Sequence, residues 1–114
     1  MKLERGTVVL VGLDPTRGHE QRGKRPCVIV SDADVSADQR FPLVAVVPIS
    51  ATVGQGAFYP ALEPGRSGLR KASYALVDQI RSVDKRRIER AFGKIPPEEV
   101  AAIDEGLRLF LGLG

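Results

Sequence analysis

Short runs of β-branched and apolar residues restrict this chain to a mainly β fold. The first covers residues 7–14 and ends in an Asp-Pro turn signal, the second covers 27–31 after Pro26, and the third covers 43–50. Pro48 in the third run predicts a bulge or a sheet edge, because proline cannot donate to a ladder. Residues 32–40 are polar and fit a short helical turn. Further strands are expected at 58–62, from 73 through 80 towards Val83, and at 90–95.

The periodicity changes after Pro96. Val100, Ile103, Leu107 and Phe110 recur three to four residues apart, which predicts one amphipathic C-terminal helix. About six to seven short strands followed by one helix predict a small β-barrel with a helical addition. With 114 residues, 43% of them apolar, the chain is expected to form one domain, residues 1–114, with a real core.

The end of this helix is apolar nearly all round. Leu109, Leu111 and Leu113 lie outside the main stripe, so we expect either a homodimer interface there or a frayed tail. Cys27 is the single cysteine, which excludes an intrachain disulfide and fits a buried residue in a cytoplasmic protein. Neither a signal peptide nor a run long enough to cross a bilayer is expected.

Residues 15–26 form an unusually long and charged connection between the first two strands. Four of the twelve are cationic and one, Glu20, is a carboxylate, while Gly18 and Gly23 allow the backbone to bend closely around a ligand. Strand connections normally need about two to five residues, so this loop points to a function. Guanidinium groups hold phosphate in two places at once, and we expect a nucleic-acid site.

The charges are segregated although the net charge is only +3. The acids collect at 32–38 and in the terminal helix, whereas the bases form groups elsewhere. Such segregation predicts a basic face for a phosphate backbone or an acidic peptide, unless the groups are only solvated loops. Beyond the long loop, the basic groups are Arg66, Arg70 and Lys71, and then Lys85, Arg86, Arg87 and Arg90.

Three blocks in order resemble the MazF/PemK toxin family. The first is the DPTRG, EQ, G and RP pattern of residues 14–26, the second is Pro48-Ile49-Ser50, and the third spans 74–87 with DQIR and VDKRR. Ser50 stands where the family more often has threonine, and His19 where a small polar residue is frequent. The resemblance implies an SH3-like barrel, a homodimer, and a metal-independent endoribonuclease that cuts single-stranded RNA at short sequences and leaves 2′,3′-cyclic phosphate ends. It also implies an antitoxin partner with an acidic, disordered C-terminal segment.

The family positions give Arg25 and Ser50 catalytic roles. The fork of Arg25 can hold two phosphate oxygens, and this electrostatic role fits better than proton donation, because a guanidinium is effectively always charged. A free hydroxyl is a poor base, so we expect Ser50 to hydrogen-bond the phosphate or the 2′-hydroxyl. Glu20 either accepts the proton or orients Arg25. His19 is the only histidine, and no spacing typical of metal ligands is present, so no cofactor is expected.

The remaining candidates are assigned to RNA binding. His19 could stack on a base or lie in solvent, and Gln79 with Asp78 could read base edges or tie the loops together. Tyr59 is the expected stacking platform, and core packing is expected for the other aromatics, including Phe92 and Phe110. Phosphate contacts are expected from residues that weaken binding in a salt-dependent way when removed. The full RNA-binding set is Arg17, His19, Gln21, Arg22, Lys24, Tyr59, Arg66, Arg70, Lys71 and Gln79.

Two other classes of protein remain open on sequence. A gyrase poison like CcdB shares the barrel but has no need of the Glu20 and Arg25-Pro26 block. A non-catalytic RNA- or peptide-binding barrel would need the basic face but not Ser50. A purely structural module would leave the long charged loop unexplained.

Overall fold

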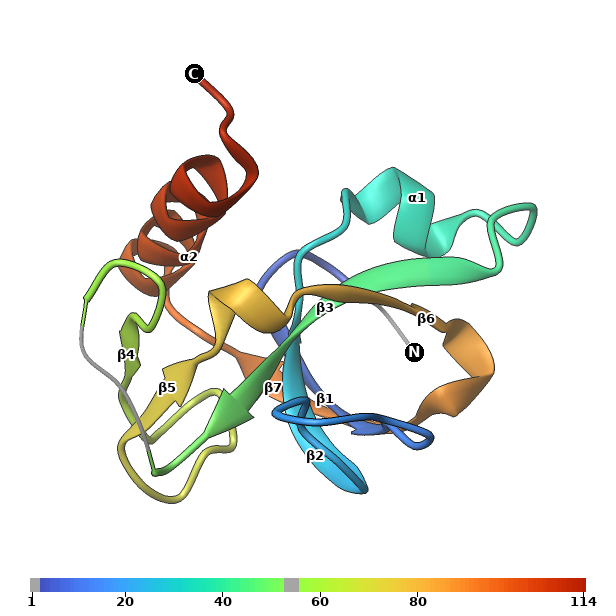
Figure 1. The fold of residues 1–114 in the computed structure, drawn as a ribbon. Coiled ribbons are helices and arrows are strands. Elements are labelled where there is room, and N and C mark those ends of the chain that lie inside the picture. Colours follow the sequence, from blue (N-terminus) through green and yellow to red (C-terminus); the bar gives the residue numbers. More distant parts are fainter. Residues whose placement is uncertain (1–2, 53–55) are drawn as a thin grey trace.

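The computed structural model describes residues 3–52 and 56–114, and its centre is one curled antiparallel sheet (Figure 1). Hydrogen-bonded strands follow the order β4-β5-β3-β2-β1-β7, and β6 pairs with the first half of β3. The prediction of a mainly β barrel with a C-terminal helix is confirmed. The elements are β1 (Thr7–Gly12), β2 (Lys24–Ile29), α1 (Ala33–Ala37), β3 (Leu43–Ser50), β4 (Ala61–Leu62), β5 (Ser73–Ala75), η1 (Val77–Gln79), β6 (Arg81–Asp84), η2 (Lys85–Arg87), β7 (Ile88–Lys94) and α2 (Pro97–Leu111).

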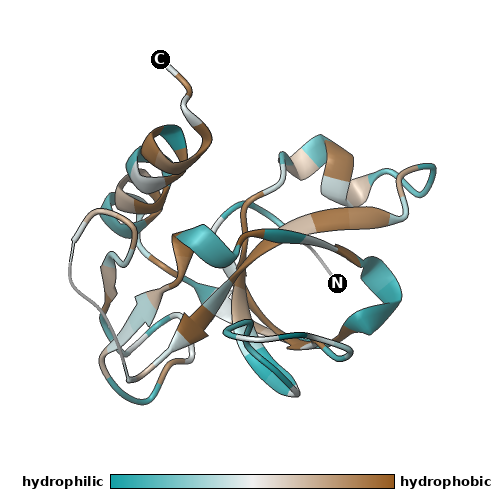
Figure 2. Cartoon of the chain, viewed as in Figure 1, coloured by the Kyte–Doolittle hydropathy of each residue, from teal (hydrophilic) through white to brown (hydrophobic). Residues whose placement is uncertain are grey.

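Both faces of the sheet are apolar, and each is buried. Neighbouring residues of β1 point to opposite faces, so Val8 and Val9 belong to two different core clusters. Val9 packs inside the curl with residues of β2, β3 and β6, whereas Val8 packs in the cluster that includes Ile103 and Leu107 of α2. Figure 2 shows the hydrophobic colour concentrated along β3 and in bands of α2. The three central strands therefore hold the layers together and fix the position of whatever they carry.

The long strand expected from residue 73 onwards is wrong, because η1 interrupts it. The ladder pairs Ile49 with Ala75 and Val46 with Arg81, so six residue steps (75 to 81) match only three on β3 (46 to 49). Pro48 lies between the two ladders and has no N–H to donate there. The chain leaves the sheet at this point, and the single turn of η1 takes up the three extra residues.

Other boundaries differ less. The strand expected at 58–62 is reduced to β4, and the strand expected at 7–14 ends at Gly12. β2 begins at Lys24, which places Pro26 inside the strand and not at its start. This is tolerated because the ladder from β2 to β3 begins only at Cys27. The short helical turn expected within 32–40 is α1.

Helix α2 begins with Pro97 at its first turn and ends at Gly112, which adopts the left-handed conformation that favours glycine. Its buried side includes Ile103 and Leu107, as expected. The prediction that Phe110 continues this buried stripe is wrong, because Phe110 is 41% exposed. Its ring instead meets Phe58 edge to face, with 5.6 Å between the ring centroids. Within residues 3–52 and 56–114, no helix has the length and apolar character needed to span a membrane.

The turn at residues 64–68 lies directly on β7. The Gly93 N–H donates to the Ser67 carbonyl at 3.2 Å, and the backbone of the turn comes so close that a Cβ on Gly93 would lie 1.9 Å from the Arg66 carbonyl oxygen. On the other side of the contact, a Cβ on Gly68 would lie 2.7 Å from the Phe92 Cβ. Two glycines thus allow the turn to dock, and the basic residues that follow it, Arg70 and Lys71, line a groove together with Phe92.

Candidate active site

The ladder between β2 and β3 brings Arg25 and Ser50 together. Its last pair is Cys27 with Pro48, and the same register continued by two residues places Arg25 opposite Ser50. Both residues line one groove, which has a volume of about 420 Å³. Residues 25 positions apart in the sequence therefore line one groove, because β2 and β3 are paired just before them.

The wall of this groove is basic and its floor is apolar. Arg70 and Lys71 line it on the side of the turn that docks on β7, and neither forms an ion pair with any described residue. Leu10, Leu69 and Phe92 are among its apolar lining residues. Arg66, the third member of this basic group, instead lines a separate and larger groove with residues of the β7–α2 connection.

The Arg25 guanidinium is exposed and largely unpaired. Its Nε donates to the Arg22 carbonyl at 3.1 Å, which fixes the side chain against its own loop. Its two terminal nitrogens have no hydrogen-bond or ion-pair partner in residues 3–52 and 56–114. A guanidinium anchored through Nε keeps the outer edge of its fork free for an anion. No structural salt bridge occupies Arg25 in the part of the chain that is described.

Ser50 is buried at the end of β3 and is only 7% exposed. Its Oγ lies 2.9 Å from the Thr52 Oγ1, and the Thr52 N–H donates to the same Ser50 oxygen at 3.2 Å. Thr52 is a residue that sequence reasoning missed. The only available signal was a second hydroxyl two positions after Ser50, which is too common a pattern to single out.

The long loop holds Glu20 beside a different and smaller pocket. The Arg17 N–H donates to Glu20 Oε1 at 2.7 Å, and no ion pair joins Glu20 to Arg25 among the described residues. Glu20 lines a pocket of about 140 Å³ together with Gln21 and Pro48. The structure thus groups Arg25 with Ser50 and places Glu20 at a neighbouring site.

Side chains from the third sequence block hold that pocket together. The Gln21 N–H donates to Gln79 Oε1 at 2.8 Å, which ties the long loop to η1. The Tyr59 hydroxyl donates to Asp78 Oδ2 at 2.6 Å, and this bond raises the pKa of Tyr59. Gln79 and Asp78 therefore tie loops together, and Tyr59 is half-buried with its polar end already bound.

The other candidates of the long loop lie at the surface. His19 is exposed, and so is Arg17, whose backbone N–H donates to the Glu20 carboxylate. Arg22 is also exposed, with its carbonyl bound to Arg25. Lys24 pairs with Glu89 of β7 at 3.1 Å, although two thirds of its side chain remains exposed.

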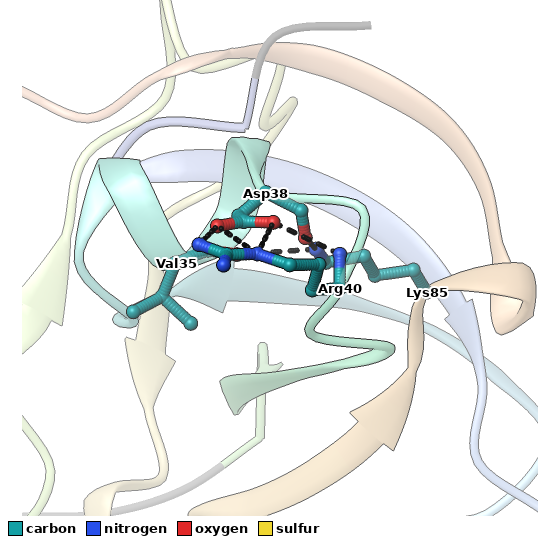
Figure 3. Close-up of polar contacts among 4 residues, drawn as sticks. All are labelled: Val35, Asp38, Arg40 and Lys85. Carbon is teal, nitrogen blue, oxygen red and sulfur yellow. Dashed lines mark hydrogen bonds and ion pairs between the residues drawn. The ribbon is translucent and has the colours of Figure 1, made fainter.

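Three members of the third basic group, Lys85, Arg86 and Arg87, bond to other residues of the chain. Lys85 donates from Nζ to the carbonyls of Val35 and Asp38, at 3.1 and 2.9 Å, and so caps the end of α1 (Figure 3). Asp38 also binds Arg40, which holds the pKa of that carboxyl below its usual range. In the same way Arg86 pairs with Asp84 and lowers its pKa to about 2. Arg87 donates to the carbonyls of Gly12 and Asp14.

Core packing is the wrong assignment for most phenylalanines. Phe41 is 48% exposed, Phe58 36% and Phe92 41%, because each lies on a loop or an edge strand. Phe92 lies in the same groove as Arg25, and the Arg90 guanidinium carbon sits 4.8 Å from the centre of its ring. The apolar floor of the groove therefore includes an exposed ring that sequence reasoning had placed in the core.

Cys27 is fully buried, as expected, between β1 and β3. Burial raises the pKa of its thiol to about 12, so the residue stays protonated at physiological pH. It packs as a small apolar side chain in the cluster inside the curl.

A curled β-sheet with an unpaired arginine and a buried hydroxyl in one basic groove defines a class of small barrels suited to holding a phosphodiester. Within that class, residues 4–111 match the model of the PemK-like, MazF-like toxins of type II toxin–antitoxin systems. The chain belongs to this family, and the resemblance seen in its three sequence blocks is confirmed.

Individual relatives cover almost the whole chain. The curated protein Endoribonuclease MazF9 of Mycobacterium tuberculosis is 33% identical over 117 residues, which cover 97% of this chain and 98% of that protein. A crystal structure of MazF from Deinococcus radiodurans superposes with a TM-score of 0.79 at 28% identity and covers 96% of both chains. A MazE–MazF structure from the same organism matches at 26% identity with a TM-score of 0.78, covering 100% of this chain and 99% of that one.

Proposed function

We propose that this protein is an endoribonuclease that cuts single-stranded RNA at a short sequence without a metal ion. The observation that carries this proposal is that Arg25 and Ser50 line one groove together with two unpaired cations, Arg70 and Lys71. An unpaired arginine fork beside a hydroxyl is suited to a phosphodiester as its negative charge grows. The relative named MazF9 is an endoribonuclease, and this supports the assignment.

The proposed reaction is an internal transesterification. The ribose 2′-oxygen attacks the adjacent phosphorus, the bond from phosphorus to O5′ breaks, and the products are a 2′,3′-cyclic phosphate and a 5′-hydroxyl. One proton leaves the 2′-hydroxyl and one reaches O5′. The terminal nitrogens of Arg25 hold the non-bridging oxygens, and Ser50 hydrogen-bonds to the phosphate or the 2′-hydroxyl.

Glu20 is proposed as the proton acceptor. Its Oε1 accepts from the Arg17 N–H, and its Oε2 has no hydrogen-bond partner in the described part of the chain. Glu20→Gln keeps this capping bond and removes the basic oxygen, so it should lower the cleavage rate more at acidic than at alkaline pH if another group can replace it. Equal activity of the glutamine variant at every pH would remove Glu20 from the reaction.

RNA is proposed to lie along the groove and the long loop. Phosphate contacts in this arrangement are sequence-independent, whereas the pocket beside η1 is polar and small enough to read one base edge. The residues proposed to contact RNA are Arg17, His19, Gln21, Arg22, Lys24, Tyr59, Arg66, Arg70, Lys71 and Gln79.

The proposed partners are a second copy of the chain and an antitoxin. Leu109, Leu111 and Leu113 at the end of α2 are each at least half exposed, and burying them in a homodimer would remove this surface from water. The matched Deinococcus radiodurans structure is a MazE–MazF structure. We therefore propose an antitoxin whose acidic, disordered C-terminal segment covers the basic groove, with both proteins in the cytoplasm where mRNA is translated.

The decisive experiment is cleavage of a long, mixed-sequence single-stranded RNA in excess EDTA, with mapping of both new ends. Wild type and Ser50→Thr should cut at one short motif, while Arg25→Ala and Ser50→Ala should lose most of the rate. Arg40→Ala is the matched control, because Arg40 is an exposed arginine that pairs with Asp38 and does not line the groove, and it should keep full activity.

A second substrate separates the chemistry from binding. A single 2′-deoxy substitution at the mapped site removes the attacking oxygen, so cleavage should stop there while binding persists. Binding without cuts in any RNA would favour a non-catalytic barrel. Inhibition of gyrase in place of RNA cleavage would favour a gyrase poison, which has no use for the pairing of Arg25 with Ser50.

A further inference from the structure

Ser50 has a conformational problem that threonine would not have. A serine side chain can occupy three staggered χ1 positions, whereas the methyl group of threonine restricts this rotation. Ser50 is the last residue of β3, and the β3–β5 ladder pairs its backbone with Tyr74 but leaves its χ1 rotation unrestrained. An undirected hydroxyl would point at the phosphate for only part of the time.

Two contacts from one residue remove this freedom. The Thr52 Oγ1 lies 2.9 Å from the Ser50 Oγ, and the Thr52 N–H donates to the same oxygen at 3.2 Å. The two bonds approach the Ser50 oxygen from the backbone and from the side chain of a single residue. Rotating the Ser50 hydroxyl to another staggered position would break both of them at once.

Ser50 and Thr52 differ in how far they are exposed to solvent. Ser50 is buried and lines the groove with Arg25, whereas Thr52 is exposed on the bend that follows β3. Thr52 itself does not line this groove. It can therefore act on the reaction through Ser50 without lying on the path proposed for the RNA.

We propose that Thr52 is a positioning residue that holds the Ser50 hydroxyl in its working orientation and replaces the restraint that a threonine at position 50 would supply. This inference rests on the proposed function, in which Ser50 touches the phosphate. It also explains how serine can serve at this position: the restraint comes from a side chain two residues away.

The test is a double-substitution cycle on the full-length protein. Thr52→Val removes the hydroxyl but keeps the backbone N–H and the branched shape. In the wild-type background it should lower kcat about three- to tenfold, because Ser50 no longer favours one of its three χ1 positions and loses one hydrogen bond. The KM for RNA should change less than twofold. In the Ser50→Thr background the same substitution should lower kcat less than twofold.

Each other result overturns the inference. An equal loss in both backgrounds would mean that Thr52 acts directly or through the fold, and a rise in KM alone would make it an RNA contact. No loss in the wild-type background would mean that Ser50 needs no restraint.

A readout without RNA separates this inference from the proposed function. The three-bond Hα–Hβ couplings of Ser50, measured by NMR on the free protein, should indicate one χ1 position in wild type and averaging in Thr52→Val. Averaged couplings in wild type would refute the positioning role even if RNA cleavage is normal. A single rotamer in wild type, lost in Thr52→Val, would support it even if the protein cut no RNA.

Discussion

Replacing Gly93 by alanine tests how tightly the turn at 64–68 packs on β7. An ideal Cβ at this position would lie 1.9 Å from the Arg66 carbonyl oxygen, whereas ordinary contact begins near 3.4 Å, so the turn must retreat by about 1.5 Å. That displacement also breaks the bond from the Gly93 N–H to the Ser67 carbonyl. Overpacking costs about 1–3 kcal/mol and the lost hydrogen bond about 0.5–1.5 kcal/mol, so the free energy of unfolding should fall by about 2–4 kcal/mol.

Urea unfolding at one fixed protein concentration measures this loss. With an m-value of about 1.5–2 kcal/mol/M, the midpoint of Gly93→Ala should fall by about 1–2 M. Gly12→Ala is the matched control, because Gly12 lies on the neighbouring strand and a Cβ added there would meet nothing within 4 Å. Its midpoint should stay the same or rise slightly, since alanine restricts the unfolded chain. If the two variants are equally stable, the close approach of the turn to β7 is refuted.

Further predictions concern the thiol, the groove and the end of the helix. The unfolded chain loses the Cys27 proton above about pH 9 and the folded protein only near pH 12, so the unfolded state binds fewer protons between these values and stability falls as pH rises. The stability advantage of wild type over Cys27→Ala should therefore shrink by about 1.4 kcal/mol per pH unit above pH 9 in urea titrations, and a constant difference would contradict the burial argument. Lys71→Ala should weaken RNA binding and reduce the slope of log affinity against log salt by about 0.7, whereas an unchanged slope would exclude a phosphate contact. Leu111→Asp should give monomers in light scattering, and a persistent dimer would place the interface elsewhere.

Much of the site could be predicted from the sequence because it lies on strands. The apolar runs around Pro26 and before Ser50 define β2 and β3, and the sequence blocks of the family indicate which residues of these strands matter. Strand pairing then brings Arg25 and Ser50 together. What the sequence could not provide is the partner of each side chain, as for Glu20, whose carboxylate is bound to its own loop.

The failures have tertiary causes. The apolar residues of 73–83 are typical of a strand, but Pro48 on the neighbouring strand has no N–H to donate to this segment, and no local pattern shows that. The sequence predicts Phe92 to be a core residue, yet its position on an edge strand leaves the ring lining the groove. Thr52 depends on a bend after β3 whose geometry is set by the fold. In each case a residue distant in sequence or a local turn decides the outcome.

The candidate residues fall into two groups: those held by strand pairing and those carried by the long loop. Arg25 pairs with Val11 in the β1–β2 ladder and Ser50 pairs with Tyr74 in the β3–β5 ladder, and such ladders tolerate little change without loss of the barrel. The long loop joins β1 to β2, and its middle is tied to η1 by the bond from the Gln21 N–H to Gln79. Under the proposed function, substitutions in the loop would change the choice of target while the strands that carry Arg25 and Ser50 stay constant.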